Sequence, residues 1–383
     1  QFRSSAASDV YKRQSLIRIA DELIDKSINP KIEVTPDQEI SETEEKLYNL
    51  AEKDQINSGP IDFKSVLTSA TNQINEAFNR KGKLSGIDTG FSGLNRQLGG
   101  LNKSDLIVLA GRPAMGKTAL ATNIGFNAAK SSNSHQNDAI LIFSLEMSAE
   151  QLAQRILAEQ STIDSHKLRS GDIDEKEFSK LVATQNDIYN LPFFIDDTPA
   201  ISVGQIASRA RRLKRTSGLG LIVIDYIQLI QGSKASEAQG RVQEVSSITR
   251  GLKSIAKELN VPILALSQLS RAVEQREDKR PILADLRESG SIEQDADVVM
   301  FVYREEYYLD KSEPTQRDNE NQESFNERFI KWQDRRNSAE GKAEIIISKQ
   351  RHGPTGIIQV QFEAKFTRFM DLVQDNRLPD QIY

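Results

Sequence analysis

The sequence contains no cysteine and only three histidines among its 383 residues. Without cysteine, the chain has no disulfide, no thiolate metal site and no cysteine nucleophile, and it is compatible with a reducing compartment. His135, His166 and His352 are far apart in sequence, which argues against a metal site built from several histidines. No run of apolar residues approaches the roughly 18 that span a membrane, and no segment resembles a signal peptide. We therefore expect a soluble cytoplasmic protein.

The chain has little excess of charge of either sign. Its 50 Lys and Arg residues against 55 Asp and Glu residues give a formal net charge of −5. This balance argues against a nucleic-acid-binding protein whose whole surface is basic. It leaves room for a local basic site, because binding depends on where the charge lies. Hydrophobic residues make up 38% of the sequence, which is enough for one large domain or two medium ones.

One stretch matches the pattern Gly-x-x-x-x-Gly-Lys-[Ser/Thr] of a phosphate-binding loop. It lies between an apolar run of strand length, 105–110, and a helix-compatible stretch, 119–129, which is the context that the motif requires. The glycines let backbone N–H groups converge on phosphate oxygens, and the following helix adds the positive end of its dipole. Lys117 is expected to contact the β- and γ-phosphates, and Thr118 to offer its hydroxyl to Mg²⁺. The predicted nucleotide-binding residues are Gly111, Arg112, Pro113, Ala114, Met115, Gly116, Lys117 and Thr118.

The segment before this motif divides into several parts. Residues 1–14 lack apolar periodicity, and we interpret them as a non-native scar. Residues 15–58 begin with apolar residues at helical spacing, which predict a helix over 15–26, and then become polar, with a second helix expected over 41–52. We interpret them as the remnant of a helical N-terminal domain and a linker. Residues 59–79 carry a second apolar stripe, and this helix can lie on its own domain or on a neighbouring subunit. We assign 80–373 to the main domain and 374–383 to a C-terminal tail.

From residue 86 onward, apolar runs of strand length alternate with helical stretches. This alternation predicts an α/β fold with a mainly parallel sheet covered by helices on both faces. The last two runs are expected to form a β-hairpin. Residues 304–341 interrupt the pattern, and we interpret them as a polar insertion that holds one short helix. The predicted strands are 105–110, 139–143, 193–195, 221–224, 262–266, 298–303, 344–348 and 357–362.

Polar side chains follow several predicted strands, at the sheet edge where ligands bind in open α/β folds. Asp225 ends the run 221–224, as expected for a carboxylate that holds Mg²⁺ beside a phosphate-binding loop. Glu146 follows another strand and can orient the water that attacks a γ-phosphate. Alternatively, it lies near the start of the next helix, where negative charge is favourable. Gln268 is suited to sense whether a γ-phosphate is present.

Three further stretches carry charges whose role the pattern leaves open. Residues 285–297 include Arg287 and backbone amides around Gly290, which can hold phosphodiester oxygens or form a solvated loop. Lys349 and Arg351 lie on one side of an extended chain, where they can act as an arginine finger on the next subunit or be surface charge. For the cationic run 209–215 we favour a solvated or subunit-facing helix over a nucleic-acid site.

Taken together, these stretches closely resemble the bacterial replicative DNA helicases of the DnaB family, which have a RecA-like motor. The resemblance runs from about residue 15 to about residue 372, and 285–297 is its most discriminating segment. It implies a homohexameric ring that encircles single-stranded DNA. Such a ring moves 5′ to 3′ and unwinds duplex DNA at the replication fork, driven by hydrolysis of ATP with Mg²⁺. The matching stretches are 111–118, 144–147, 224–229, 265–269, 285–297 and 349–354.

The resemblance also implies roles for individual residues of the nucleotide site. Lys117 is expected to bind phosphate, and Thr118 and Asp225 to hold Mg²⁺, with Asp225 as the Walker B acid. Glu146 corresponds to the catalytic carboxylate. Gln268 corresponds to the residue that senses the γ-phosphate.

Other positions correspond to contacts outside the subunit. Lys349 and Arg351 match the catalytic pair that acts on the neighbour's nucleotide. Arg287, Glu288 and Gly290 match the loop that touches the DNA backbone in the central channel.

The family pattern carries further expectations and leaves two alternatives. The helix of 59–79 corresponds to a linker helix that docks on a neighbouring subunit. Primase and a helicase loader are the implied protein partners, although only the last helices of the family's N-terminal collar domain are matched. One alternative is a RecA-like recombinase or repair ATPase that forms filaments on DNA. The other is a ring-defective fragment that binds nucleotide without motor activity.

Overall fold

The computed structural model describes residues 2–29, scattered positions between 36 and 75, and residues 84–132, 138–232, 240–317 and 320–372. The chain divides into two compact units, Gln1–Lys83 and Leu84–Tyr383. In the first unit, α1 (Phe2–Ile28) contains the helix expected over 15–26 and begins earlier than expected. The described positions from 63 to 75 are helical. Most of the helix expected over 41–52 and the tail 374–383 lie outside the described residues.

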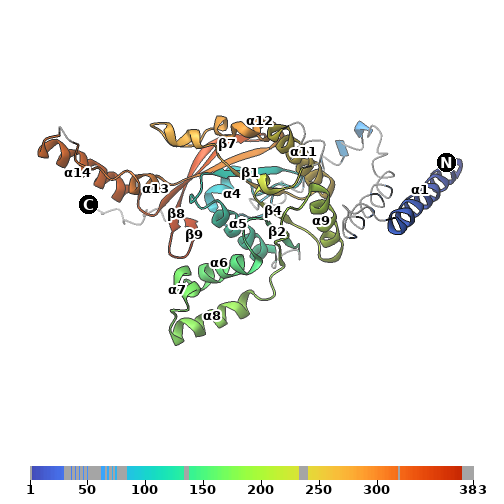
Figure 1. Cartoon of the computed structure of the whole chain (residues 1–383), viewed down its shortest axis with the longest axis horizontal. Coiled ribbons are helices and arrows are strands. Elements are labelled where there is room, and N and C mark those ends of the chain that lie inside the picture. Colours follow the sequence, from blue (N-terminus) through green and yellow to red (C-terminus); the bar gives the residue numbers. More distant parts are fainter. Residues whose placement is uncertain are drawn as a thin grey trace. The chain divides into compact units, whose positions relative to one another are not determined.

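A nine-stranded sheet organises the described part of the second unit, in the order β3-β2-β4-β5-β1-β6-β7-β8-β9 (Figure 1). The strands from β3 to β6 are parallel, and β7, β8 and β9 are added in antiparallel fashion. The strands are β1 (Leu106–Gly111), β2 (Ile140–Ser144), β3 (Phe193–Asp196), β4 (Leu221–Asp225), β5 (Ile263–Gln268), β6 (Val298–Tyr303), β7 (Lys342–Gln350), β8 (Gly356–Glu363) and β9 (Arg368–Asp371).

All eight predicted strands are present, most with ends shifted by one or two residues, and the β7–β8 hairpin is confirmed. The ninth strand, β9, is not predicted from the sequence. It is short and pairs only with β8, and its burial depends on contacts with β8 and α5. The expectation of an α/β fold with a mainly parallel sheet and a C-terminal hairpin is confirmed.

Helices cover both faces of the sheet. The crossover from β1 to β2 runs toward the β3 end of the sheet, whereas those from β3 to β4 and from β4 to β5 run back. Because such crossovers are right-handed, α5 lies on one face and α9 and α11 lie on the other. The helices are α4 (Ser92–Leu98), α5 (Lys117–Ser132), α6 (Ala149–Ser161), α7 (Ser165–Ser170), α8 (Glu175–Ile188), α9 (Val203–Ser217), α11 (Arg241–Leu259), α12 (Gly290–Asp295), α13 (Glu305–Asp310) and α14 (Gln322–Ala339), with short 3-10 turns η1 (Ile227–Leu229), η2 (Arg271–Gln275) and η3 (Leu283–Ser289).

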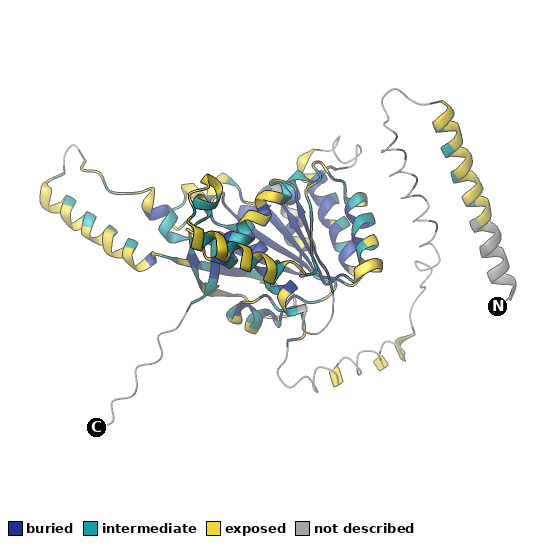
Figure 2. Ribbon diagram, turned by 90° about the horizontal axis from the view of Figure 1, so that it is seen from below, coloured by how far each residue is buried: buried dark blue, intermediate teal, exposed yellow. Residues whose placement is uncertain are grey.

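The central strands form the core. Every residue of β1 and β6 is buried. The dark blue strands at the centre of Figure 2 show this buried part of the sheet. This burial on both faces explains the continuous apolar runs of the sequence. None of the helices in the described part of the chain is both long and apolar enough to cross a membrane.

The expectation of one short helix in 304–341 is wrong, because this segment contains α13 and the 18-residue α14. Phe325, Phe329 and Trp332 lie on α14 at helical spacing and contact one another. The ring of Phe329 lies 6.0 Å from that of Phe325 and 5.5 Å from that of Trp332. The indole N–H of Trp332 donates to the carbonyl of Leu309 at 3.0 Å. These contacts fold the insertion into two helices, and α14 projects from the sheet with most of its surface exposed (Figures 1 and 2).

Candidate nucleotide-binding and hydrolysis site

The phosphate-binding loop connects β1, which ends at Gly111, to α5, which begins at Lys117. Ala114 and Gly116 have positive φ angles of 65° and 93°, which turn the loop back on itself. At Gly116 a side chain would also meet a neighbour, because a Cβ would lie 2.9 Å from the ring of Phe369 on β9. The loop is therefore packed directly against β9. Its exposed residues are Pro113 and Ala114, whereas Met115 is buried.

Two arginines brace the loop. Arg112 is buried, and its guanidinium donates to the carbonyl of Leu269 at 3.0 Å and forms an ion pair with Glu274 at 2.9 Å. Arg304, which follows β6, donates to the carbonyl of Ala114 at 3.4 Å. Because the guanidinium of Arg112 is already engaged, this residue is placed to offer a phosphate its backbone N–H.

Strand register brings the polar strand ends next to the loop. Pairing of β1 with β5 places Gly111 opposite Gln268, and pairing of β2 with β4 places Ser144 opposite Asp225. Glu146 follows β2 by two residues and is exposed. The structure thus brings Gln268, Asp225 and Glu146 to the edge of the sheet that carries the phosphate-binding loop.

The carboxylate of Asp225 is buried at the end of β4. Neither of its oxygens has a hydrogen-bond partner in the described part of the chain. Burial raises the pKa of Asp225, and the nearby Thr118 hydroxyl and Lys117 ammonium offset this effect only in part. A buried carboxylate beside a threonine hydroxyl fits Mg²⁺, which prefers oxygen ligands and completes its shell with water and phosphate oxygens. Among the described residues, no group of three or more His, Cys, Asp or Glu side chains could hold a metal by itself.

Lys117 is half-buried beside Asp225. Burial lowers the pKa of Lys117, and the charges of Asp225 and then Glu146 oppose that effect. Its ammonium lies 5.7 Å from the ring centroid of Tyr226, which follows Asp225 through a cis peptide bond. A cation that burial disfavours is stabilised by an anion at the same place, and a nucleotide phosphate supplies one.

Arg155 also belongs to this site, although no motif singles it out. It lies on α6, and its charge interacts with those of Asp225 and Glu146. Burial lowers the pKa of Arg155, and the two carboxylates oppose that effect. The signal in the sequence is a cation three residues after Leu152 and one before Ile156, both of which are buried.

Gln228 is a second residue whose position the sequence does not explain. It lies in η1, just after β4. Its side-chain N–H donates to the hydroxyl of Ser267 at 2.9 Å, and its side-chain oxygen, Oε1, accepts from the backbone N–H of Gln268 at 3.4 Å. Gln228 therefore ties the end of the Asp225 strand to the backbone of Gln268.

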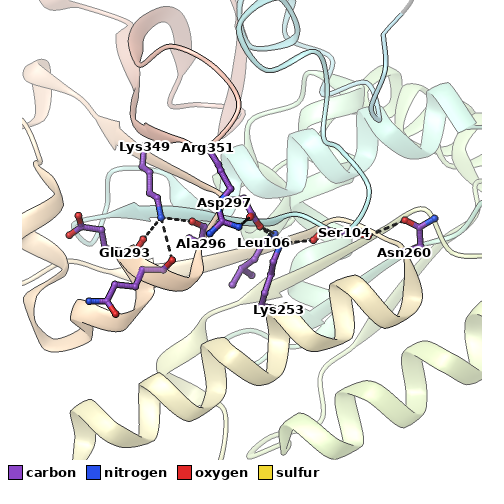
Figure 3. Close-up of polar contacts among 10 residues, drawn as sticks. Ser104, Leu106, Lys253, Asn260, Glu293, Ala296, Asp297, Lys349 and Arg351 are labelled. Atoms are coloured by element: carbon purple, nitrogen blue, oxygen red, sulfur yellow. Dashed lines mark hydrogen bonds and ion pairs between the residues drawn. The ribbon is translucent and has the colours of Figure 1, made fainter. Parts of the chain in front are cut away.

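Lys349 and Arg351 lie at the end of the sheet opposite the phosphate-binding loop. Figure 3 shows them with Asp297 and Ala296. Antiparallel pairing with β6 places the end of β7 where the parallel strands begin. Arg351 pairs with Asp297 at 3.0 Å, and the same carboxylate accepts from the backbone N–H of Leu106, the first residue of β1, at 2.9 Å. The length of β1, about 16 Å, separates this end from the phosphate-binding loop. Neither cation can therefore reach the loop of its own chain.

The ammonium of Lys349 is bound to the end of α12. It donates to the carbonyls of Glu293 at 2.5 Å, Ala296 at 2.7 Å and Gln294 at 3.4 Å. Burial lowers the pKa of Lys349, and the charge of Arg351 adds to that effect. An ammonium has three N–H donors, so all of them are engaged with backbone carbonyls in this state.

The segment predicted to contact DNA forms η3 and α12. It begins near the loop edge, where the backbone N–H of Ser270 donates to the carbonyl of Asp285 at 3.1 Å, and it ends at Asp297 near the opposite edge. The side chains of 287–291 lie outside the described residues. Contact of Arg287, Glu288 and Gly290 with DNA therefore stays a prediction.

The cationic run 209–215 lies on α9, and several of its side chains bind other parts of the fold. Arg209 forms an ion pair with Asp196, and Arg211 forms one with Glu258 at 2.6 Å. Arg209 and Arg211 are therefore held within their own chain, and a solvated or subunit-facing role for this helix stays a prediction.

Comparison with known proteins identifies the family. The family model of the DnaB-like helicase C-terminal domain matches residues 86–371. The replicative DNA helicase DnaB of Rickettsia bellii is 45% identical over 95% of this chain and 73% of the relative. The replicative DNA helicase DnaB of Geobacillus stearothermophilus is 42% identical over 96% of this chain and 70% of the relative.

Two solved structures agree with this result. One, described as an ATPase domain, is 33% identical, with a TM-score of 0.69, and the match covers 82% of this chain and all of that one. A DnaB-like replicative helicase described with its interactions with primase is 31% identical, with a TM-score of 0.74, over 96% of this chain and 78% of that one. With its RecA-like α/β core, the chain belongs to the DnaB-like helicase family.

Proposed function

We propose that this chain is the motor of a replicative DNA helicase in which each ATP site is completed by two subunits. The two halves of the site lie at opposite ends of the parallel strands: one half follows the strands and the other lies where they begin. Lys117, Asp225 and Gln268 lie at the loop edge, and Lys349 and Arg351 lie at the other. This separation is the observation that supports the proposal, because one copy cannot bring the halves together. A ring of copies does so at every interface, and the family resemblance points to six.

At the loop edge, the chain would bind ATP through backbone N–H groups of the phosphate-binding loop, Pro113 excepted because it has none, and through the ammonium of Lys117. Thr118 and Asp225 would hold Mg²⁺, which when bound draws charge from the β- and γ-phosphates. Glu146 is exposed at this edge, where it can accept a proton from the attacking water or orient it. Gln268 would change its hydrogen bonds when the γ-phosphate leaves.

Arg155 would add a positive charge to the same site from its own subunit. Its charge interacts with those of Asp225 and Glu146, which are both assigned to this site. A half-buried arginine there can stabilise the negative charge that develops on the transferred phosphoryl group. Lys349 and Arg351 of the next subunit would act on the same phosphate from outside.

The segment 283–295, which is proposed to contact DNA, runs from the end of the sheet with the phosphate-binding loop to the end with Arg351. Asp285 is bonded near the end of β5, and Asp297 lies beside Arg351. Lys349 holds the last carbonyls of α12 and would have to release at least one of them to bind a neighbour's phosphate. Nucleotide binding at an interface would thereby change how the segment 283–295 is held, which couples hydrolysis to movement along single-stranded DNA in the 5′ to 3′ direction.

Contacts beyond the motor are also part of the proposal. Phe63, Leu67 and Ile74 share an apolar stripe in the segment 59–79 and are exposed. This stripe fits the docking of a linker helix on a neighbouring subunit. Primase and a helicase loader in the bacterial cytoplasm are the expected protein partners. The domain boundaries stay predictions from the sequence.

Unwinding of a forked duplex tests this function. With ATP and Mg²⁺, the chain should separate a fork that carries a free 5′ tail and fail on one with only a 3′ tail. ATP-dependent strand pairing or filament formation without unwinding would indicate the recombinase instead. A chain that stays monomeric with and without nucleotide, and neither hydrolyses ATP nor unwinds DNA, would indicate the ring-defective fragment.

A further inference from the structure

Asp297 lies at the centre of the polar network at the Arg351 edge (Figure 3). Its side chain is only 3% exposed, and three donors converge on its carboxylate. One oxygen accepts from the Arg351 guanidinium at 3.0 Å, and the other accepts from the Leu106 backbone N–H at 2.9 Å and from the Lys253 ammonium. The carbonyl of Asp297 also accepts from the backbone N–H of Arg351 at 2.9 Å.

The network holds the Arg351 side chain in place but leaves it able to bind a phosphate. Its side chain is 51% exposed, although the carboxylate that binds it is buried. A guanidinium has five N–H donors, and the network uses one of them, at one end of the fork. The remaining donors can meet a phosphate while the bond to Asp297 stays in place. Lys349 differs, because its three donors are all engaged with carbonyls of α12 and of Ala296, the residue after it.

We infer that Asp297 is a positioning residue for the arginine that acts on the neighbouring subunit's nucleotide. The inference rests on the proposed function, since it concerns the site shared between subunits. The buried carboxylate accepts from the backbone N–H of Leu106, the first residue of β1, and this bond fixes it to the sheet independently of Lys253. It aims one end of the Arg351 guanidinium and restricts the rotamers of a long side chain before a phosphate arrives.

A structural role alone predicts different behaviour. If Asp297 served only to neutralise Lys253 and to bind Leu106, its replacement would lower folding stability and affect every property of the subunit. Lys253 shares the carboxylate and also donates to the carbonyl of Ser104 at 2.7 Å, so Lys253→Met is the matched control. This control removes the other ion pair of Asp297 and leaves its contact with Arg351.

Complementation between subunits tests the inference. Asp297→Asn, in the full chain, should lower the DNA-stimulated kcat about tenfold to hundredfold, the range for losing a charge-assisted hydrogen bond, and leave the KM for ATP unchanged. Mixing it with Lys117→Ala, which has a defective phosphate-binding loop and an intact Arg351, should restore turnover. Mixing it with Arg351→Ala should not. The double variant Asp297→Asn with Arg351→Ala should turn over no more slowly than Arg351→Ala alone.

The reference mixture is Arg351→Ala with Lys117→Ala. If it regains turnover and the Asp297→Asn mixture does not, Asp297 has no positioning role. If neither mixture regains turnover, the shared site itself is wrong, and the inference falls with it. Lys253→Met should keep the parent's kcat, and a loss equal to that of Asp297→Asn would also overturn the inference. Reduced stability of Asp297→Asn does not obscure the result, because a misfolded subunit cannot supply the working loop that complementation requires.

Discussion

Asp225→Asn should stabilise the protein in the absence of nucleotide and Mg²⁺ while removing its response to both. The carboxylate of Asp225 is buried, and neither oxygen has a hydrogen-bond partner among the described residues. A neutral amide of nearly the same shape costs less to bury. An unsatisfied buried group typically costs about 1–3 kcal/mol. We expect a gain of about 1 kcal/mol, at the low end of that range, because Lys117 and Arg155 lose an attractive charge.

The pH dependence has a defined sign. Burial raises the pKa of Asp225 in the folded state, so the folded protein holds this proton more tightly than the unfolded chain does. The contribution of this group to stability is therefore greatest at low pH and declines as the pH rises from the ordinary aspartate range through the raised value. Asp225→Asn should lack this decline, and its advantage over the parent should be larger at pH 8 than at pH 4 or below.

Urea denaturation measures both effects. Without nucleotide, the variant should unfold at a higher urea concentration than the parent at pH 8. With a non-hydrolysable ATP analogue and Mg²⁺, the parent should gain stability by mass action and the variant should gain little. Asp187→Asn, at an exposed position, is the control and should change neither quantity. A variant that is less stable than the parent without ligands, or equally stabilised by the analogue with Mg²⁺, would refute the reasoning.

Three further predictions concern other parts of the motor. Burial raises the pKa of Glu159 to about 7 from 4.5, so folding stability should decline as the pH rises through that interval. Glu159→Gln should remove about 3 kcal/mol of this decline in urea titrations at several pH values, and an unchanged pH dependence would contradict it. Gly116→Ala brings a Cβ to 2.9 Å from Phe369 at a positive φ, so it should cost about 1–3 kcal/mol of stability and weaken binding of a fluorescent nucleotide. Lys349→Met removes three bonds to carbonyls at the end of the segment 283–296, so single-stranded DNA affinity, measured by anisotropy, should respond less to nucleotide. An undiminished response would exclude Lys349 from the coupling.

The strands and the loop edge could be predicted because their signals are local. Burial on both faces makes each central strand a continuous apolar run, and the phosphate-binding motif lies within eight consecutive residues. The C-terminal ends of parallel strands lie at the same end of the sheet, so the residues that follow these strands lie close together. This is why Asp225, Glu146 and Gln268 could be assigned to one place before the register was known.

The parts that were missed depend on contacts between distant segments. In β9 the buried residue is Phe369, which packs against the phosphate-binding loop, a segment far away in sequence. The helix α14 is stabilised by a bond from Trp332 to Leu309 and by aromatic contacts that a polar composition conceals. Asp297 is one acidic residue among several in a polar segment, and only the fold shows that it is the one bound to Arg351.

ATP hydrolysis with and without single-stranded DNA, by the chain lacking residues 1–14 and by its Arg351→Ala variant, tests the central claim most directly. Arg351 cannot reach its own phosphate-binding loop, so only a shared site makes its removal harmful to hydrolysis. The account predicts DNA-stimulated turnover that collapses in Arg351→Ala while nucleotide binding persists. Equal DNA-stimulated turnover in the two proteins would show that each subunit hydrolyses ATP alone, and the two-subunit site would be wrong.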